Sequence, residues 1–187
     1  MTAAPSLPLI ELDGPLTTVL TEAGATPADL YRVLANQPVL LEGWLRLAGA
    51  LRNGARTSRA TRELMILRAA QLMNASYQWR DHREMARVAG VADGAVQALA
   101  HWQASDLFDV EQRTALALVD AMIQGHVPQE VLLELTERFS ASDALELILT
   151  AGFYCMVPRV LDALRLSADV EVPRPFSNNN DTPIKGD

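Results

Sequence analysis

The order of apolar and polar positions between Thr57 and Gly90 predicts two helices with a break around residues 74–76. On the first helix, apolar side chains point in nearly every direction, which is typical of a helix buried on all sides. Glu63 belongs to this helix, so we expect a carboxylate in the core. The second helix separates its faces, with its charged side formed by Arg80, Asp81, Arg83, Glu84 and Arg87.

The inward side of this second helix is apolar except for Gln78 and His82. If the two helices fold back on each other as a hairpin, Glu63 lies about eleven residues before the break and His82 about seven after it. At a rise of about 1.5 Å per residue, their heights differ by only about 6 Å. We therefore expect the acid and the imidazole to meet, directly or through one water.

Helical spacing continues through the rest of the chain, and no strand pattern competes with it. We expect helices at residues 27–36, 38–51, 93–99, 109–125, 128–139 and 143–166. Ser58 is a suitable N-cap for the Glu63 helix, and Asp109 with Gln112 has the spacing of a capping box. Ser140 or Ser142 caps the last helix, which Pro158 should kink or split. The predicted fold class is all-α.

The two ends of the chain differ from this helical part. Residues 1–26 are interrupted by prolines and predict an N-terminal arm. Residues 27–166 form the predicted helical domain. Residues 167–187 are polar and rich in proline and asparagine, so we expect a C-terminal tail that is flexible or lies on a neighbouring subunit.

Composition excludes several classes of function. The net charge of −7 and the lack of a basic stripe argue against nucleic-acid binding. We see no apolar run of ~18 residues and no leader, so we expect a cytoplasmic protein without a membrane segment. The single cysteine, Cys155, rules out an intrachain disulfide or a dithiol pair. His82, His101 and His126 have no metal-site spacing, so no metal is expected.

Glu63 and His82 are the candidate catalytic residues. A buried carboxylate needs a partner or a raised pKa, and either condition suits acid–base chemistry near neutral pH. The alternative is structural: His82 as a hydrogen-bonded core histidine, with Glu63 paired to Arg68 or another arginine. Gln78 is a candidate substrate ligand or a partner of the backbone. Trp79 is a candidate substrate platform or core residue. On a helical wheel of the second helix, Tyr77 falls on the polar side, and it lines the site only if the helix starts after it.

The segment TRELMILRAAQL followed by SYQWRDH resembles the carboxymuconolactone decarboxylase family, and GFYCMVPRVLDAL at 152–164 is similar to one of its subgroups. The resemblance covers roughly residues 30–166. It implies an AhpD-like fold, an orthogonal helix bundle around a central helical hairpin. Members often carry a glutamate, a Cys-x-x-Cys pair and a histidine, and here Glu63 and His82 match the first and last. The cysteine positions fall on Ala75 and Gln78.

Without the two thiols, a hydroperoxidase of the dithiol type is not expected, because neither alanine nor glutamine forms a sulfenic acid or a disulfide. The remaining acid–base half resembles the decarboxylase branch. The predicted function is a cofactor-free lyase or isomerase acting on a small organic acid or lactone. His82 would be the acid or base, with Glu63 as its partner and Gln78, Tyr77 and Trp79 lining the pocket. The alternatives are a non-catalytic scaffold and, less in keeping with the residues, an antioxidant role. The resemblance also implies a homo-oligomer, a trimer or hexamer.

Overall fold

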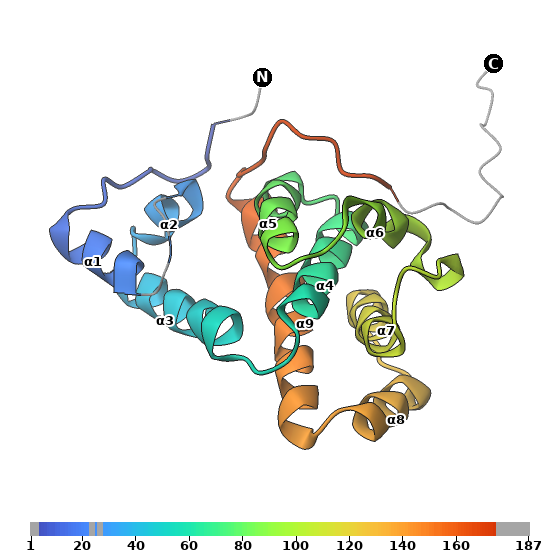
Figure 1. The fold of residues 1–187 in the computed structure, drawn as a ribbon. Helices are drawn as coiled ribbons and strands as arrows, with labels where there is room; N and C mark the ends of the chain where they lie inside the picture. The colour runs from blue at the N-terminus through green and yellow to red at the C-terminus, as the bar shows by residue number, and fades with distance from the viewer. Residues whose placement is uncertain (1–3, 23–24, 26–27, 175–187) are drawn as a thin grey trace, which may run out of the picture.

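The computed structural model describes residues 4–22, 25 and 28–174, and the regular structure in these residues is entirely helical (Figure 1). This confirms the all-α prediction. A π-helical turn, η1 (Ala50–Gly54), and a 3-10 segment, η2 (Leu99–Ala104), supplement the α-helices. The α-helices are α1 (Gly14–Glu22), α2 (Asp29–Leu34), α3 (Pro38–Gly49), α4 (Arg59–Leu72), α5 (Ser76–Val88), α6 (Asp93–Ala98), α7 (Val110–Gln124), α8 (Gln129–Arg138) and α9 (Ala141–Ala163).

The predicted hairpin of α4 and α5 is the centre of the fold. Asn74 adopts a φ of 51° between the two helices, and this left-handed residue lets the chain reverse within a few residues. Helix α4 packs against α5, α7 and α9 together, and every residue from Thr61 to Gln71 is buried. Ser58 caps α4 by accepting a hydrogen bond from the Thr61 backbone. The expectation of a helix buried on all sides is therefore confirmed.

The predicted helix ends in the second half of the chain are also found. Asp109 and Gln112 form a reciprocal capping box at the start of α7, and Gly125 ends α7 with a φ of 90°. Of the two candidate caps for α9, Ser140 is the one used. Helix α9 continues through Pro158 without interruption, so the split that we considered is wrong. Val157, Pro158 and Leu161 are all buried, and this packing holds the helix together across the missing donor.

The expectation of no long apolar run is wrong for α9. An 18-residue window of this helix reaches a mean hydropathy of 1.5. Half of that window is buried inside the structure, where α9 contacts α4 and α7. The length and composition of α9 are thus also those of a core helix.

The two ends of the chain are more ordered than their composition indicates. In the predicted arm, α1 packs on α3 and buries Leu20 in a small cluster with Leu41 and Leu45. At the other end, residues 167–174 run beside α5 (Figure 1), where the Ala168 backbone donates to Ser76 Oγ at 3.0 Å and Val172 is buried. Residues 175–187 of the predicted tail lie outside the described residues.

A buried ion pair joins α4 to α7 and η2. The guanidinium of Arg68 donates to both carboxylate oxygens of Asp120, at 2.7 and 3.0 Å, and also to the side chain of Gln71 and the backbone oxygen of Leu99. Trp102 donates to the same carboxylate at 3.0 Å. Arg68, which we considered as a partner of Glu63, is therefore paired elsewhere.

We predict that Asp120→Ala destabilises the fold by about 3 kcal/mol, because it leaves a buried guanidinium without its counter-charge. For a chain of this size, that loss lowers the melting temperature by roughly 6–12 °C. Thermal unfolding followed by circular dichroism measures the change. Asp106→Ala, at an exposed turn residue, is the control. Equal melting temperatures for the two variants would contradict the prediction.

Candidate functional site

A buried pair of side chains connects the two helices of the hairpin. Nδ1 of His82 lies 2.7 Å from Oε2 of Glu63, and Glu63 has no exposed surface. The predicted meeting of the acid and the imidazole is thus confirmed as a direct contact. It arises because the reversal at Asn74 brings the inward faces of α4 and α5 together at the same height.

A third side chain also contacts the carboxylate of Glu63. The guanidinium of Arg59, one turn before Glu63 on α4, lies 2.5 Å from Oε1 of Glu63. The carboxylate is therefore held by both an arginine and a histidine, so the predicted contact with His82 and the alternative pairing with an arginine occur together. The arginine is Arg59 rather than Arg68. Its spacing of four residues from Glu63 was a signal in the sequence that we did not use.

The surroundings of Glu63 favour its ionised form. Burial raises the pKa of this carboxyl, but the hydrogen bonds and charges of His82 and Arg59 outweigh burial, and the pKa falls below its ordinary value. An ionised carboxylate can only accept hydrogen bonds, so the proton of the contact lies on Nδ1 of His82. Nε2 is then the ring nitrogen that is available to a ligand.

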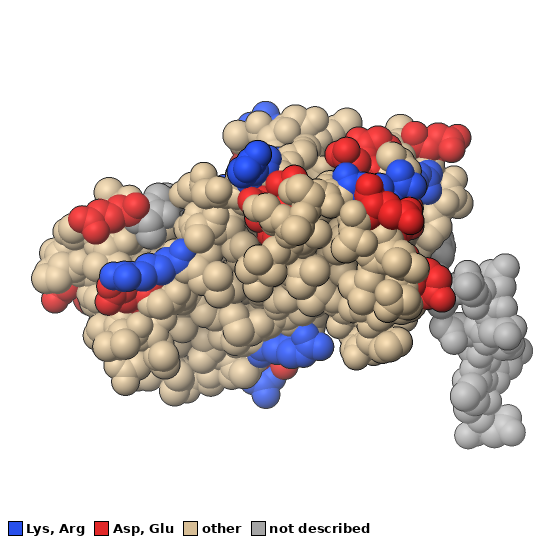
Figure 2. All heavy atoms as spheres, turned by 90° about the horizontal axis from the view of Figure 1, so that it is seen from below, with Lys and Arg blue, Asp and Glu red and all other residues tan. Residues whose placement is uncertain are grey.

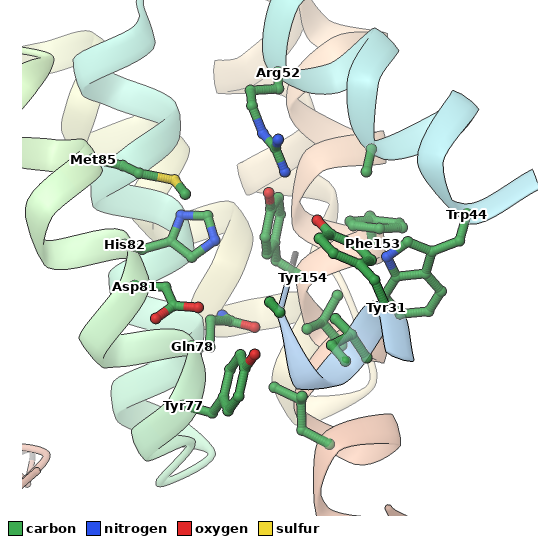
Figure 3. A pocket seen from close by; sticks show the side chains of 15 residues that line it. Tyr31, Trp44, Arg52, Tyr77, Gln78, Asp81, His82, Met85, Phe153 and Tyr154 are labelled. Carbon is green, nitrogen blue, oxygen red and sulfur yellow. The ribbon is translucent and has the colours of Figure 1, made fainter. Parts of the chain in front are cut away.

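The imidazole faces a cavity of about 70 Å³ between α5 and the helices α2, α3 and α9. Figure 3 shows α5 forming one wall, with Tyr77, Gln78, Asp81, His82 and Met85. The opposite wall is mainly aromatic, with Tyr31, Trp44, Phe153 and Tyr154. The ring of Tyr154 meets that of His82 edge to face at 5.0 Å. This volume holds a few water molecules or one small group of a ligand.

Arg52 reaches the same cavity from the π-helical turn η1 (Figure 3). Such turns occur often at functional sites because they displace one residue from the regular helix. Burial lowers the pKa of the Arg52 guanidinium, whereas the hydroxyls of Tyr31 and Tyr154 raise it, and the net effect is upward. Arg52 is therefore a permanent cation in the cavity wall.

Tyr154 contributes a neutral hydroxyl to this group. Burial, only partly offset by Arg52, raises its pKa to about 12. The hydroxyl thus stays protonated at neutral pH and can donate a hydrogen bond.

Of the three predicted pocket residues, two line the cavity. Gln78 does so with its Nε2 bonded to the backbone oxygen of Ile66 at 2.9 Å. Tyr77 is also buried there, although the wheel placed it on the polar side; Arg80 lies over its ring at 4.6 Å and covers it. Trp79 does not reach the cavity. It is buried on the other side of α5 with Leu64 and Ala86, so it is a core residue.

The remaining sequence candidates lie away from the cavity. Cys155 is half-buried, and burial raises the pKa of its thiol, with Arg159 opposing this effect. His101 and His126 are both exposed. Within the described residues, no group of three or more histidine, cysteine, aspartate or glutamate side chains has the geometry of a metal site. On the face in Figure 2, basic and acidic side chains lie in small separate groups and form no continuous basic stripe.

Sequence reasoning missed Tyr31, Arg52, Arg59 and Tyr154. Tyr154 belongs to the GFYCMVP segment that carries part of the family resemblance, and that was the available signal. Tyr31 and Arg52 approach the cavity from α2 and η1, and no spacing pattern relates them to α5.

Solved structures support this description of the fold. A protein of unknown function from Agrobacterium tumefaciens, described in connection with the antioxidant defence protein AhpD, is 19% identical with a TM-score of 0.66, covering 73% of this chain and 95% of its own. An uncharacterised peroxidase-related protein from Silicibacter sp. TM1040 is 17% identical with a TM-score of 0.72, covering 87% of this chain and 90% of its own.

The debrominase Bmp8 is a third structural match. In a variant with alanine in place of a cysteine, bound to 2,3,4-tribromopyrrole, it is 18% identical with a TM-score of 0.71, covering 90% of this chain and 94% of its own. At these identities the matches show the AhpD-like fold alone. Among curated proteins, no sequence matches the chain.

A family model covers the part of the chain that carries the site. The model of the carboxymuconolactone decarboxylase family matches residues 38–121, which include Arg52, Glu63 and His82. Residues 38–121 therefore match the carboxymuconolactone decarboxylase family within an AhpD-like fold, and this chain lacks the Cys-x-x-Cys pair.

Proposed function

We propose that this protein is a cofactor-independent acid–base enzyme, a lyase or isomerase, that acts on a small organic acid or lactone. The observation that carries the proposal is the His82–Glu63 contact of 2.7 Å beside a small cavity. Because Glu63 holds the proton on Nδ1, the neutral imidazole presents the lone pair of Nε2 to a ligand. The same logic orients the histidine in other acid–base sites.

The chemistry needs a base, an acid and a group that stabilises negative charge. When a carboxyl group on the carbon next to a carbonyl is lost as carbon dioxide, the C–C bond breaks and its electron pair is delocalised onto the carbonyl oxygen as an enolate. Arg52 and the Tyr154 hydroxyl supply positive charge and a hydrogen-bond donor for the enolate oxygen. Nε2 of His82 takes up a proton from solvent, and the resulting imidazolium delivers that proton to the enolate carbon, which returns the imidazole to its neutral form. In an isomerisation, Nε2 first takes a proton from the substrate and afterwards returns it.

A thiol-based antioxidant role has less support, although two of the structural matches are described in connection with antioxidant or peroxidase proteins. Ala75 and Gln78 replace the thiols, and Cys155 is neither in the cavity nor favoured as a thiolate. A scaffold without catalysis would account for the Arg59–Glu63 pair, but it gives no role to the polar groups that face the cavity.

We predict that His82→Ala lowers turnover by about 10²–10⁴-fold while the protein stays folded, because the variant loses its proton-transfer group. The assay incubates the protein with a panel of β-keto acids and carboxylated lactones in D₂O. Proton NMR then follows both loss of carbon dioxide and uptake of deuterium next to the carbonyl, so it detects a lyase and an isomerase alike. His126→Ala, a surface substitution of the same type, is the control. Unchanged turnover in His82→Ala would rule out the mechanism.

The ionised state of Glu63 gives a pH-dependent prediction for stability. Its pKa in the folded protein lies below that of the unfolded chain, about 4.3. The unfolded state therefore binds the proton first as the pH falls. The stabilisation is present above about pH 4.3 and is lost as the pH falls through the lower folded pKa.

We expect Glu63→Gln to be less stable than the wild type at pH 7, with a difference that narrows below about pH 4.3, because glutamine has no charge to lose. Urea unfolding at pH 7, 4.5 and 3 measures this difference. Glu137→Gln, an exposed change on α8, should follow the wild type throughout. A gap between Glu63→Gln and the wild type that is the same at all three pH values would contradict the assignment of an ionised Glu63.

The predicted homo-oligomer stays a prediction, and one surface of α9 supports it. Leu145, Leu149 and Met156 are exposed on one side of this helix. We expect a mass of about three or six times 20.4 kDa in size-exclusion chromatography with light scattering, because association would cover this apolar stripe. A mass equal to that of one chain would contradict it.

A further inference from the structure

Two buried polar atoms beside the cavity have no hydrogen-bond partner within the described part of the chain. One is Oε1 of Gln78 and the other is Nε of Arg52. Buried polar groups are nearly always satisfied in folded proteins, and each exception needs an explanation. Both side chains line the same cavity, so a ligand bound there is a candidate partner for both.

The amide of Gln78 is fixed as an acceptor. Its Nε2 donates to the backbone oxygen of Ile66 at 2.9 Å, so the amide nitrogen must face α4 and the amide oxygen must face away from it. Gln78 is only 2% exposed, and Figure 3 shows its oxygen directed into the cavity. A ligand that satisfies this atom must therefore bring a hydroxyl or N–H group.

Arg52, in contrast, favours a negatively charged group on the ligand. No carboxylate pairs with it among residues 4–22, 25 and 28–174, where the neighbours of its guanidinium are the hydroxyls of Tyr31 and Tyr154. Its own backbone oxygen accepts hydrogen bonds from Arg59 at 2.9 Å and Arg62 at 3.4 Å, so the turn that carries Arg52 is fixed. The carboxylate of Asp81 in the cavity wall is paired with Arg80 at 2.7 Å. A cation without a carboxylate partner favours an anionic ligand, and arginine pairs best with a carboxylate.

We infer that the cavity binds a small hydroxy acid, whose carboxylate pairs with Arg52 and whose hydroxyl donates to Oε1 of Gln78. Its carbon skeleton packs against Trp44, Phe153 and Val157, which favours a flat ring. This inference goes beyond the proposed function, because it concerns which ligand the cavity recognises and not the reaction. Binding tests it separately.

The test compares matched ligands by isothermal titration calorimetry on the full chain. The probes are 2-, 3- and 4-hydroxybenzoate, with benzoate lacking the hydroxyl and phenol lacking the carboxylate. We expect at least one hydroxybenzoate to bind about tenfold or more tightly than both benzoate and phenol, the effect of one hydrogen bond to a buried group. Equal affinities for hydroxybenzoates and benzoate, or no binding of any acid, would overturn the inference.

Two variants assign the contacts to their residues. Gln78→Met should remove the advantage of the hydroxybenzoate over benzoate and leave the affinity for benzoate unchanged. Arg52→Gln should weaken both acids about tenfold or more and leave phenol unchanged, whereas Arg46→Gln, at an exposed arginine of α3, should change nothing. A loss that is equal for all ligands would show a structural effect and overturn the assignment.

The His82→Ala variant separates this inference from the proposed function. It should bind the hydroxybenzoate while it fails to catalyse proton exchange. If the wild-type protein binds the hydroxy acid but no acid or lactone of the panel reacts, the proposed function is wrong and the binding inference stands. If turnover is found but the hydroxyl brings no advantage in binding, the inference is wrong and the proposed function stands.

Discussion

The burial of one carboxylate governs the centre of this structure. Glu63 has no exposed surface, and an ion in that position is tolerated only if the protein replaces the water it has lost. Arg59 does this at Oε1, at 2.5 Å, and His82 does it at Oε2, at 2.7 Å. The hairpin of α4 and α5 must therefore keep its register, because a shift of one residue would turn Glu63 or His82 away from the other. Stability and orientation of the imidazole come from the same contact.

Arg59 extends this constraint from the acid–base pair to the cation of the cavity. Besides its ion pair with Glu63, it donates to the backbone oxygen of Arg52 at 2.9 Å. One side chain thus links the π-helical turn to the core of α4. The acid–base pair and Arg52 are held relative to each other by a rigid element rather than by a loop, which is the arrangement that preorganised sites require.

The sequence was sufficient for the parts of the site that depend on helical periodicity. The hairpin, the burial of α4 and the meeting of Glu63 with His82 follow from turning 100° per residue around two neighbouring helices. The same reasoning placed Tyr77 wrongly, because a wheel assigns a residue to a face but does not show that Arg80 covers its ring. Periodicity also could not show whether Trp79 faces the cavity or the hydrophobic core, because α5 packs against two clusters of apolar side chains.

Other features depend on contacts between distant elements. Tyr31, Arg52 and Tyr154 meet only because α2, η1 and α9 converge on α5, and no local pattern records that convergence. The order of α1 and of residues 167–174 likewise depends on surfaces offered by α3 and α5. Continuity of α9 at Pro158 has the same origin, since tertiary packing outweighs the loss of one backbone hydrogen bond.

The two positions that correspond to the cysteines of the family lie in different environments in this structure. Ala75 is packed into the cluster that holds Trp79, whereas Gln78 faces the cavity. A thiol at position 78 would be a nucleophile beside His82, one turn away. An amide there has no covalent chemistry, but its oxygen is aimed at the space where a ligand would lie. In the proposed function and the proposed ligand binding, glutamine therefore contributes a contact to the ligand in place of a reactive thiol, and the Glu63–His82 pair moves the proton. A site without the thiols therefore still has groups that can contact a ligand, but binding then depends on the hydrogen-bond donors and charges of the ligand.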